Sequence, residues 1–492
     1  MKRIAIILFF VSSLSSFANQ YDNSKAYQAV PVRTDLFPNP ESDRYLIVGA
    51  GPAGLAFARI FQANGIPFDI VEAESGVGGI WYPDACVTSV YPNVTMNSSK
   101  TMSQYDGYDM PEEFPDYLSS RQAWEYLDSF ARHYGIKEKV KFDSRVTVLH
   151  PDSQGERWTA GIRHLDQLEV KSYLGAVIAS GFQRIPNFPE AYQQWDSNQA
   201  ERLSFVHAMH LKNLEDFKDK VVVVWGGGNT GFDIATQLSK VAKKVYLSLR
   251  RGYWLVPEYI FGQPADAFAG DGPKLPHWFE KIAFRALVWW YIGSFEKLGL
   301  PKPDHDLLEM LPVTARQDTI DALKARRIIA ISNISEISGD TLILSDGSTI
   351  SDVDQGVIAT GYKHLVPYIE ESSAKEALNL HDDGPDFYLH LFHPNPAQIP
   401  ALNNIFLSGG YLETLAGGWP TYDHQAKAAA AYILAKAQGK RSAEFFDKEK
   451  ASGVSPDLKG HVFKADQHRN RYGVDFQIYH QVLDEKTEEL SQ

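Results

Sequence analysis

Two glycine-rich turns carry the residues whose type and spacing could do chemistry. Gly49, Gly51 and Gly54 stand in GAGPAG, and Gly226, Gly228 and Gly231 stand in GGGNTG. Each turn follows an apolar run and leads into a helical pattern. The first glycine of such a turn permits a tight bend, the second lets backbone approach a pyrophosphate, and the third lets helix pack on strand. Both turns, which also contain Pro52, Ala53, Asn229 and Thr230, are therefore predicted to bind dinucleotides.

The residues that end the following strands differ between the two turns. The strand after the first turn ends at Glu72, which is placed to accept hydrogen bonds from ribose hydroxyls. The strand after the second turn ends at Arg250 and Arg251, and guanidinium groups favour the 2′-phosphate of NADP. Surface salt bridges are the alternative role for these arginines. We expect a flavin in the first turn and a nicotinamide in the second, with hydride passing between stacked rings.

Two short segments after Glu72 add candidate contacts. In GGIW, Gly79 leaves room for a flat or anionic group, and Trp81 could cover it. In MNSSK, Asn97 offers an amide beside small hydroxyl residues. Core packing is the alternative for Trp81, and an ordinary turn position is the alternative for Asn97.

Size and composition limit the number of domains, the partners and the kinds of site that this protein can have. At 492 residues and 55.2 kDa the chain is expected to form two or three domains. Its formal charge of −13 disfavours nucleic acid as a partner. The single cysteine, Cys86, excludes an intramolecular disulfide, a two-cysteine redox centre and a cysteine-rich zinc site, and we expect no metal.

The first residues have the layout of a secretory signal. Lys2 and Arg3 precede an apolar run from Ile4 to Val11, and small residues end at Ala18. We expect residues 1–18 to be removed and the protein to be exported, with residues 19–42 as a loose leader. The alternative is an uncleaved N-terminal membrane anchor. No other stretch approaches a membrane span.

The order of the motifs resembles that of a known family. The chain resembles the flavin-containing monooxygenases and the related Baeyer–Villiger enzymes, which are class B flavoprotein monooxygenases. The resemblance rests on GAGPAG with Glu72, GGIW at 78–81, MNSSK at 96–100, GAVIASGF at 175–182, GGGNTG at 226–231, RRGYWLVP at 250–257, GVIATGYK at 356–363 and the pair Gln425–Ala426.

The resemblance implies an α/β fold with two Rossmann-type domains, in which an NADP domain is inserted into a discontinuous FAD domain. We expect the FAD domain at 43–215 and 356–440, the NADP domain at 216–355 with an insertion at 257–312, and a tail at 441–492. The implied FAD contacts are Gly49, Gly51, Pro52, Ala53, Gly54, Glu72, Gly79, Trp81 and Asn97. The implied NADP contacts are Gly226, Gly228, Asn229, Thr230, Gly231, Arg250 and Arg251.

The implied activity uses NADPH, O2 and a small-molecule substrate. NADPH would reduce bound FAD, the reduced flavin would take up O2 as a peroxide adduct, and one oxygen atom would pass to a nucleophilic nitrogen or sulfur, or to a ketone. By resemblance Asn97 lies near the reactive edge of the flavin, and it is the one catalytic candidate. A homodimer is left open.

One motif departs from the family pattern. The family places Phe, Gly and His before the second turn, whereas this chain has RLSFVHAMHLKNLEDF, with His207 and His210 but no glycine in register. His207 is the better match. The loss leaves heteroatom oxygenation, ketone oxygenation, an oxidase-like activity and a non-catalytic FAD-binding role all open.

The remaining patterns are less specific. Residues 257–312 are rich in aromatic side chains and could roof a substrate channel, lie on a membrane or form a core-facing helix. Residues 327–350 alternate apolar and polar residues and predict short antiparallel strands. A long alanine-rich helix is expected from residue 423 onward, beginning near the flavin.

Overall fold

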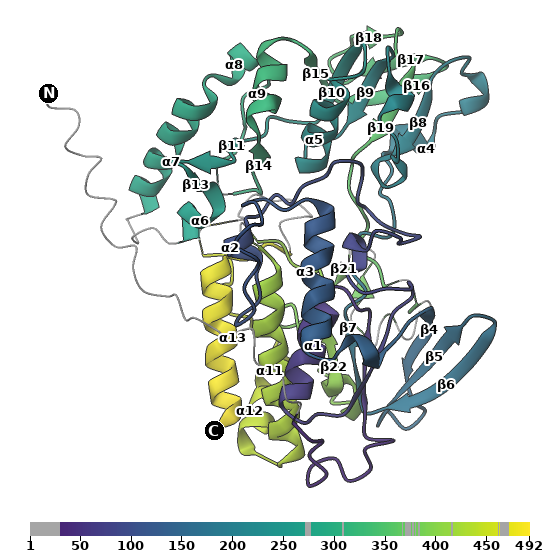
Figure 1. Ribbon diagram of the computed structural model, residues 1–492, viewed down its shortest axis with the longest axis vertical. Helices are drawn as coiled ribbons and strands as arrows, with labels where there is room; N and C mark the ends of the chain where they lie inside the picture. Colours follow the sequence, from purple (N-terminus) through teal and green to yellow (C-terminus); the bar gives the residue numbers. More distant parts are fainter. Residues whose placement is uncertain are drawn as a thin grey trace, which may run out of the picture.

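The chain folds into two lobes, each built around a parallel sheet (Figure 1). The computed structural model describes residues 30–492 except 271–276, 308, 367, 370–374, 376–377, 379, 382–383, 415–416, 461 and 463–471. The expected signal at 1–18 and most of the leader lie outside the described residues. Side chains are also not described at 269–281 and 381.

The first lobe contains a five-stranded parallel sheet in the order β22-β7-β1-β2-β3. The apolar run that precedes the first turn forms β1, and all four of its residues are buried, as expected for a strand covered on both faces. The register aligns Val48 of β1 with Val71 of β2 and Ile178 of β7. The strands are β1 (Tyr45–Val48), β2 (Phe68–Val71), β3 (Val140–Lys141), β7 (Gly175–Ile178) and β22 (Ile405–Leu407).

The second lobe repeats this arrangement with the order β15-β10-β9-β19-β8. Its central strand β9 is VVVVW and is buried throughout. Trp225 of β9 aligns with Ser248 of β10 and Ile358 of β19. The strands are β8 (Ser204–His207), β9 (Val221–Trp225), β10 (Lys244–Leu249), β15 (Ile328–Ser332) and β19 (Gln355–Ile358).

Sheet membership corrects two expected domain boundaries. Strand β8 was expected in the first domain, before residue 216, and β19 was expected to begin its return at 356, but β19 pairs with both β8 and β9. The inserted unit therefore starts earlier and ends later than the sequence indicated. A short buried run such as GVI suits either sheet, because its composition does not specify which strand it will pair with.

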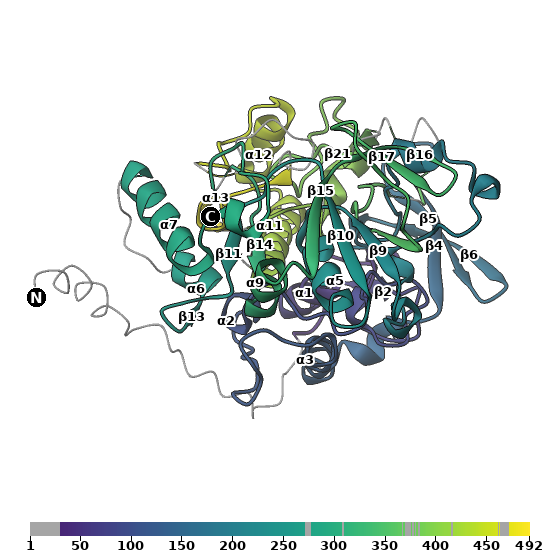
Figure 2. The ribbon, with the colours of Figure 1, turned by 90° about the horizontal axis from the view of Figure 1, so that it is seen from above.

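Helices cover the first sheet, and the expected tail is part of this layer. Figures 1 and 2 show α1, α11 and α13 side by side, with α3 alongside, and the closest helix pairs are α11 with α13 and α1 with α11. Residues Tyr479 and Leu483 of α13 are buried in the core of this lobe. The helices are α1 (Pro52–Ala63), α2 (Lys100–Ser103), α3 (Ser120–His133), α11 (Trp419–Ala437), α12 (Arg441–Ala451) and α13 (Phe476–Ser491).

The second lobe has its own helices and carries the aromatic insertion. Helix α7 buries Val288 and Ile292, whereas Trp289 and Trp290 on its other side are 67% and 77% exposed. The prediction of a core-facing helix is thus confirmed for one side of α7 only. Within the part of the chain that the structure describes, no helix is both long and apolar enough to cross a bilayer. The elements are α4 (Glu190–Gln193), α5 (Asn229–Leu238), α6 (Ala265–Gly270), α7 (His277–Ile292), α8 (Phe295–Leu298), α9 (Gln317–Lys324), β11 (Leu255–Pro257), β12 (Tyr259–Ile260), β13 (Gln263–Pro264) and β14 (Val313–Ala315).

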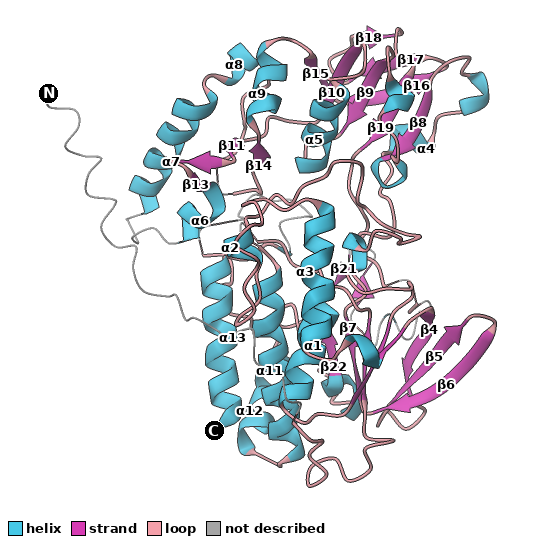
Figure 3. Ribbon diagram, in the orientation of Figure 1, coloured by secondary structure: helices cyan, strands magenta, loops and turns pink. Residues whose placement is uncertain are grey.

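Each lobe also carries a small antiparallel sheet at its outer side (Figure 3). The second lobe has β16-β17-β18, as the alternation at 327–350 predicted, although β15 within that range joins the parallel sheet. The first lobe has β4-β5-β6. Bounds are β4 (Ser144–Pro151), β5 (Trp158–His164), β6 (Gln167–Tyr173), β16 (Ile334–Ser338), β17 (Thr341–Leu344), β18 (Thr349–Ile350), β20 (Leu380–His381) and β21 (Gly384–Pro385).

Two connecting segments join the lobes and bond to each other. The segment after β7 and the segment after β19 are held together by the Lys363 N–H, which donates to the Ile185 carbonyl at 2.9 Å, and by the Asn187 N–H, which donates to Gly361 at 3.0 Å. The Thr360 hydroxyl adds a bond to the Asn187 carbonyl. The chain thus leaves and re-enters the first lobe along one paired ribbon.

Candidate functional site: two nucleotide-binding turns

The first turn has the backbone geometry that its glycines predicted. Gly49 has φ +105°, and a Cβ there would lie 2.7 Å from the carbonyl oxygen of Ala179. A Cβ on Gly54 would overlap the carbonyl oxygen of Gly49. A side chain at either position would thus collide with main chain that cannot move away easily, so glycine is required for both the bend and the helix contact.

The second turn repeats the same contacts. Gly226 has φ +136°, and a Cβ there would overlap the carbonyl of Ala359, while a Cβ on Gly231 would overlap the carbonyl of Gly226. Ala179 and Ala359 occupy equivalent places in the two predicted segments GAVIASGF and GVIATGYK. Each glycine turn therefore rests on the end of a neighbouring strand, β7 in one lobe and β19 in the other.

Glu72 lies beneath the first turn. It is 3% exposed, and its Oε2 accepts the Ala50 N–H at 2.7 Å while its Oε1 accepts the Glu74 N–H at 3.0 Å. The carboxylate thus fixes the shape of the turn. Because each carboxylate oxygen has more than one lone pair, it can still accept from a ribose hydroxyl.

The segment that contains Gly79 packs closely against the first turn. Gly79 has φ +60°, and a Cβ there would lie 3.0 Å from the Gly51 Cα, so a side chain at position 79 would crowd the turn. Trp81, which follows in the same short helical turn, is partly buried and packs against the core of the lobe.

Several buried polar atoms in the segments that follow the first turn have no hydrogen-bond partner among the described residues. They are Thr95 Oγ1 and Ser99 Oγ, which flank Asn97, and Trp124 Nε1, whose ring lies against Gly78. Buried polar atoms are normally hydrogen-bonded. A bound group with both donors and acceptors would satisfy them, and the residues present therefore fit a flavin nucleotide.

The segment with Asn97 is fixed by hydrogen bonds on both sides, while Asn97 itself is exposed. The Met96 N–H donates to Leu118 at 2.8 Å, and the hydroxyls of Ser98 and Ser103 are 2.9 Å apart. The start of α11 packs here too, since a Cβ on Gly417 would overlap the Met102 carbonyl. Helix α11 therefore begins beside the Asn97 segment, at Trp419 and not at residue 423.

Neighbouring elements hold the residues of the second turn. Asn229 Oδ1 accepts the Thr314 N–H at 2.9 Å. The ring of Tyr253 lies against Gly227, where a Cβ would overlap it. Asn229, one of the predicted contacts, thus also anchors the turn.

The two arginines after β10 have different surroundings. Arg250 is exposed, and Arg251 is partly buried with an Nε that has no partner in the described part of the chain. No ion pair joins either guanidinium to a described carboxylate within 4 Å. A buried N–H group without a partner fits an anionic ligand such as a phosphate.

His207 has a packing role at the end of β8. It is 3% exposed, its Nδ1 accepts the Met209 N–H at 3.2 Å, and its Nε2 donates to the Gly361 carbonyl at 3.3 Å. Burial lowers the pKa of His207 to about 4. A neutral ring thus joins β8 to the connecting segment, whereas His210 is exposed.

Comparison with known proteins decides the family. A family model described as flavin-binding monooxygenase-like matches residues 42–434, which is most of the chain and includes both turns. The chain belongs to the flavin-binding monooxygenase-like family. Membership places this chain among the flavoprotein oxidoreductases and confirms the predicted family.

Individual relatives agree with this assignment. The chain is 27% identical to flavin-containing monooxygenase 5 of Rattus norvegicus over 367 residues, 72% of this chain and 67% of that protein. The matched stretch is 63% of the length of the Homo sapiens counterpart.

Solved structures confirm the predicted fold class. A steroid monooxygenase bound to NADP is similar with a TM-score of 0.66 and 19% identity, over 92% of this chain and 98% of that one. An S-allyl-L-cysteine S-oxygenase from Allium sativum is similar with a TM-score of 0.59 and 17% identity, over 91% and 89%.

Two contacts between the lobes of this flavin-binding monooxygenase were not foreseen. Asp266 of α6 accepts the Ser99 N–H at 2.7 Å, and the Tyr117 hydroxyl donates to the Glu258 carbonyl at 2.6 Å. The insertion thus holds the segment that carries Asn97. No sequence motif indicates the contact of Asp266 with Ser99, because the two residues lie 167 positions apart.

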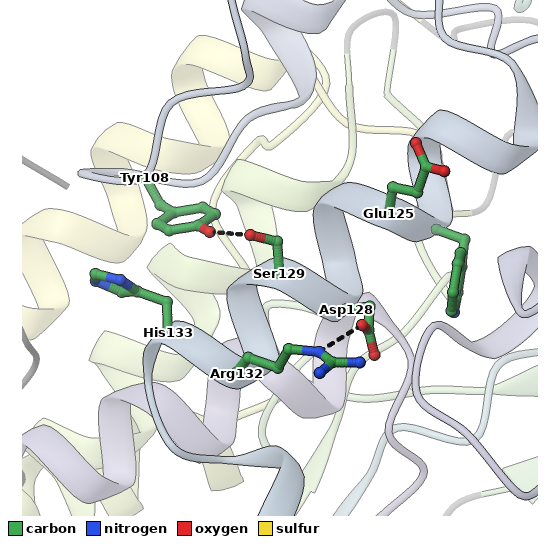
Figure 4. Close-up of a pocket in the computed structure, with 7 residues that line it drawn as sticks. Tyr108, Glu125, Asp128, Ser129, Arg132 and His133 are labelled. Atoms are coloured by element: carbon green, nitrogen blue, oxygen red, sulfur yellow. Dashed lines mark hydrogen bonds and ion pairs between the residues drawn. The ribbon is translucent and has the colours of Figure 1, made fainter. Parts of the chain in front are cut away.

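A surface pocket on α3 is a separate feature (Figure 4). It has a volume of about 590 Å³. Its polar groups pair with each other: the hydroxyls of Tyr108 and Ser129 are 2.6 Å apart, and Arg132 contacts Asp128 at 2.7 Å. These contacts leave little for a ligand to satisfy, so the nucleotide turns remain the candidate site. The residues that line the pocket are Tyr108, Trp124, Glu125, Asp128, Ser129, Arg132 and His133.

Proposed function

We propose that this protein is an FAD- and NADPH-dependent monooxygenase that oxygenates small substrates at a nucleophilic nitrogen or sulfur. The observation that carries the proposal is the pair of equivalent turns, one in each lobe of a flavin-binding monooxygenase chain. Two nucleotide sites in one chain suit hydride transfer between two cofactors.

The first turn is assigned to FAD. Gly49, Gly51, Pro52, Ala53 and Gly54 would present the start of α1 to the pyrophosphate, where the helix N-terminus favours an anion. Glu72 would accept from the ribose, and Gly79 and Trp81 would border the pyrophosphate and the ring. When bound, FAD supplies the redox chemistry, accepting hydride from NADPH and passing one oxygen atom of O2 to the substrate.

The second turn is assigned to NADP. Gly226, Gly228 and Gly231 would bring backbone N–H groups of α5 to the pyrophosphate, and Arg250 and Arg251 would bind the 2′-phosphate. The structural similarity to a steroid monooxygenase bound to NADP supports this assignment.

Asn97 is assigned the position beside the reacting atoms. Its exposed amide stands on a segment fixed by backbone hydrogen bonds, so it can hold a hydrogen bond to a reacting oxygen at low entropic cost. The chain's further contribution is to orient the rings and exclude water from between the lobes.

The test measures which substrates couple to NADPH oxidation. Purified protein is incubated in air with NADPH and an amine, a sulfide or a ketone, and oxygenated product and hydrogen peroxide are both measured. Product from the amine or sulfide supports the proposal. Product from the ketone alone would indicate Baeyer–Villiger chemistry, peroxide without product an oxidase-like activity, and no turnover a non-catalytic flavoprotein.

We further propose that the protein is exported and that residues 1–18 are removed. The support is the basic start followed by a short apolar run. Cell fractionation with N-terminal sequencing tests this. A mature product that begins near residue 19 supports export, and a full-length product in the cytoplasm contradicts it.

A further inference from the structure

Strand β6 of the outer sheet has one side without a partner strand. In the order β4-β5-β6 it pairs with β5 alone among the described strands. Figures 1 and 2 show it at the periphery of the first lobe in both views. Such an edge presents backbone N–H and C=O groups that can pair with another chain.

The hairpin register determines which residues direct these groups outward. Leu165 and Asp166 form the turn between His164 and Gln167, which pair with each other. Residues that close a two-residue hairpin turn are bonded to each other, and bonded and non-bonded pairs then alternate. Leu168, Val170 and Ser172 therefore direct their N–H and C=O groups away from β5.

The side chains of this edge are apolar on one face. Leu168 is 55% exposed and Val170 is 65% exposed, and Val148 of β4 is exposed beside them, near Gly161. A soluble protein seldom leaves both an open edge and an apolar face on the same sheet without a partner.

The opposite face carries a charge pattern that is complementary to itself. Glu169 and Lys171 flank Val170, and within the single chain the Glu169 carboxylate lies 3.2 Å from Lys171 and 2.7 Å from Lys141 of β3. If two copies of β6 pair antiparallel with Val170 on the twofold axis, Glu169 faces the partner's Lys171, and Lys171 faces the partner's Glu169. The groups directed outward at Leu168, Val170 and Ser172 then meet their counterparts in the correct alternation.

Neighbouring registers lack this match. An axis at Glu169 or Lys171 would place like charges opposite each other and would pair groups that already bond to β5. An axis at Leu168 would pair Val170 with Asp166 of the partner's turn. The central register alone satisfies both the hydrogen-bond alternation and the charges.

We propose that two copies of this chain form a dimer by antiparallel pairing of β6 with β6, which makes one continuous sheet across the twofold axis. The dimer places the two Val170 side chains next to each other, covers part of Leu168 and Val170 in both copies and closes both open edges. This inference is independent of the proposed activity.

The first test exchanges the charges. Glu169→Lys or Lys171→Glu places like charges at two cross-strand pairs, and each should weaken the dimer by roughly tenfold, whereas the double exchange should restore it. Glu336→Lys on β16, the exposed edge of the other small sheet, is the matched control and should leave the dissociation constant unchanged. Sedimentation equilibrium measures the constants, and circular dichroism checks folding.

The second test uses a cross-link in a Cys86→Ser background. Val170→Cys should form a disulfide-linked dimer under mild oxidation, because directly paired Cα atoms in an antiparallel ladder are about 5.5 Å apart, within disulfide range. Val148→Cys on β4 should not. A protein that stays monomeric at every soluble concentration, or a dimer in which position 170 does not cross-link and the charge exchange has no effect, overturns the proposal.

Discussion

Arg250 and Arg251 are the residues that would set the choice between NADPH and NADH. Arg250 is exposed at the end of β10 and Arg251 has a buried Nε without a described partner, so both have capacity to bind a phosphate. We expect Arg250→Ala to raise the KM for NADPH about tenfold or more, since a charge-assisted hydrogen bond is lost, and to leave the KM for NADH unchanged. Steady-state kinetics with both cofactors measures this. Arg202→Ala, which removes an exposed arginine paired with Asp354, is the control.

His207 makes stability depend on pH. Burial lowers the pKa of His207 from 6.5 to about 4 in the folded protein, so the unfolded state binds a proton first as the pH falls. Its contribution to stability is complete above about pH 6.5 and is lost progressively as the pH falls toward 4. We expect the melting temperature of His207→Gln to fall less steeply over this range than that of the wild type. The exposed His210→Gln should follow the wild type, and an equally steep profile in both variants would contradict this role.

At the scale of elements, two glycines of the first turn should have different roles, one in the stability of the protein and the other in flavin binding. A Cβ on Gly54 overlaps the Gly49 carbonyl, so Gly54→Ala must displace α1 from β1 and should destabilise the protein by about 1–3 kcal/mol. A Cβ on Gly51 would meet the Gly79 Cα at 3.4 Å, an ordinary contact, but under the proposed FAD assignment it would stand where the pyrophosphate approaches. Gly51→Ala should therefore fold normally and bind less flavin. Chemical denaturation and flavin absorbance measure the two effects, and normal flavin content in folded Gly51→Ala would contradict the assignment.

The contact between α6 and the Asn97 segment should affect how much of the consumed NADPH leads to oxygenated product. Asp266→Ala removes the acceptor for the Ser99 N–H and frees this segment. If Asn97 acts beside the reacting atoms, a larger share of the NADPH consumed should then appear as hydrogen peroxide, while flavin content stays normal. Asp306→Ala, which breaks an ion pair with Arg285 within the same insertion, is the matched control. An unchanged peroxide share in Asp266→Ala would show that the contact has no part in coupling.

At the scale of the whole molecule, contacts between the lobes should make unfolding cooperative. The Tyr91 hydroxyl of the first lobe donates to Asp233 of α5 at 2.8 Å, where burial raises the pKa of Asp233. Tyr91→Phe leaves this carboxyl with one partner fewer and weakens the junction by about 1–3 kcal/mol. We expect flavin release and loss of helical circular dichroism to coincide on heating in the wild type and to separate in Tyr91→Phe. Coincident transitions in the variant would mean that other contacts couple the lobes.

The sequence predicts most of what depends on local backbone geometry. The spacing of Gly49 and Gly54 predicted a bend and a close helix contact, and the structure has both. Contacts between residues far apart in the sequence could not be predicted. The strand at 355–358 was placed in the wrong sheet, and Asp266 was not recognised, because each depends on a partner more than 100 residues away. His207 was ambiguous for the same reason, since its partner Gly361 follows β19.

The ribbon formed by the segments around Ile185 and Lys363 limits how the lobes can move. A single peptide linker can twist and bend in every direction, but two linkers bonded side by side resist twisting and bending within their own plane. The motion that remains easy is bending perpendicular to the plane of the ribbon. One lobe would therefore swing toward and away from the other along a single fixed arc, so each closure brings the same faces together.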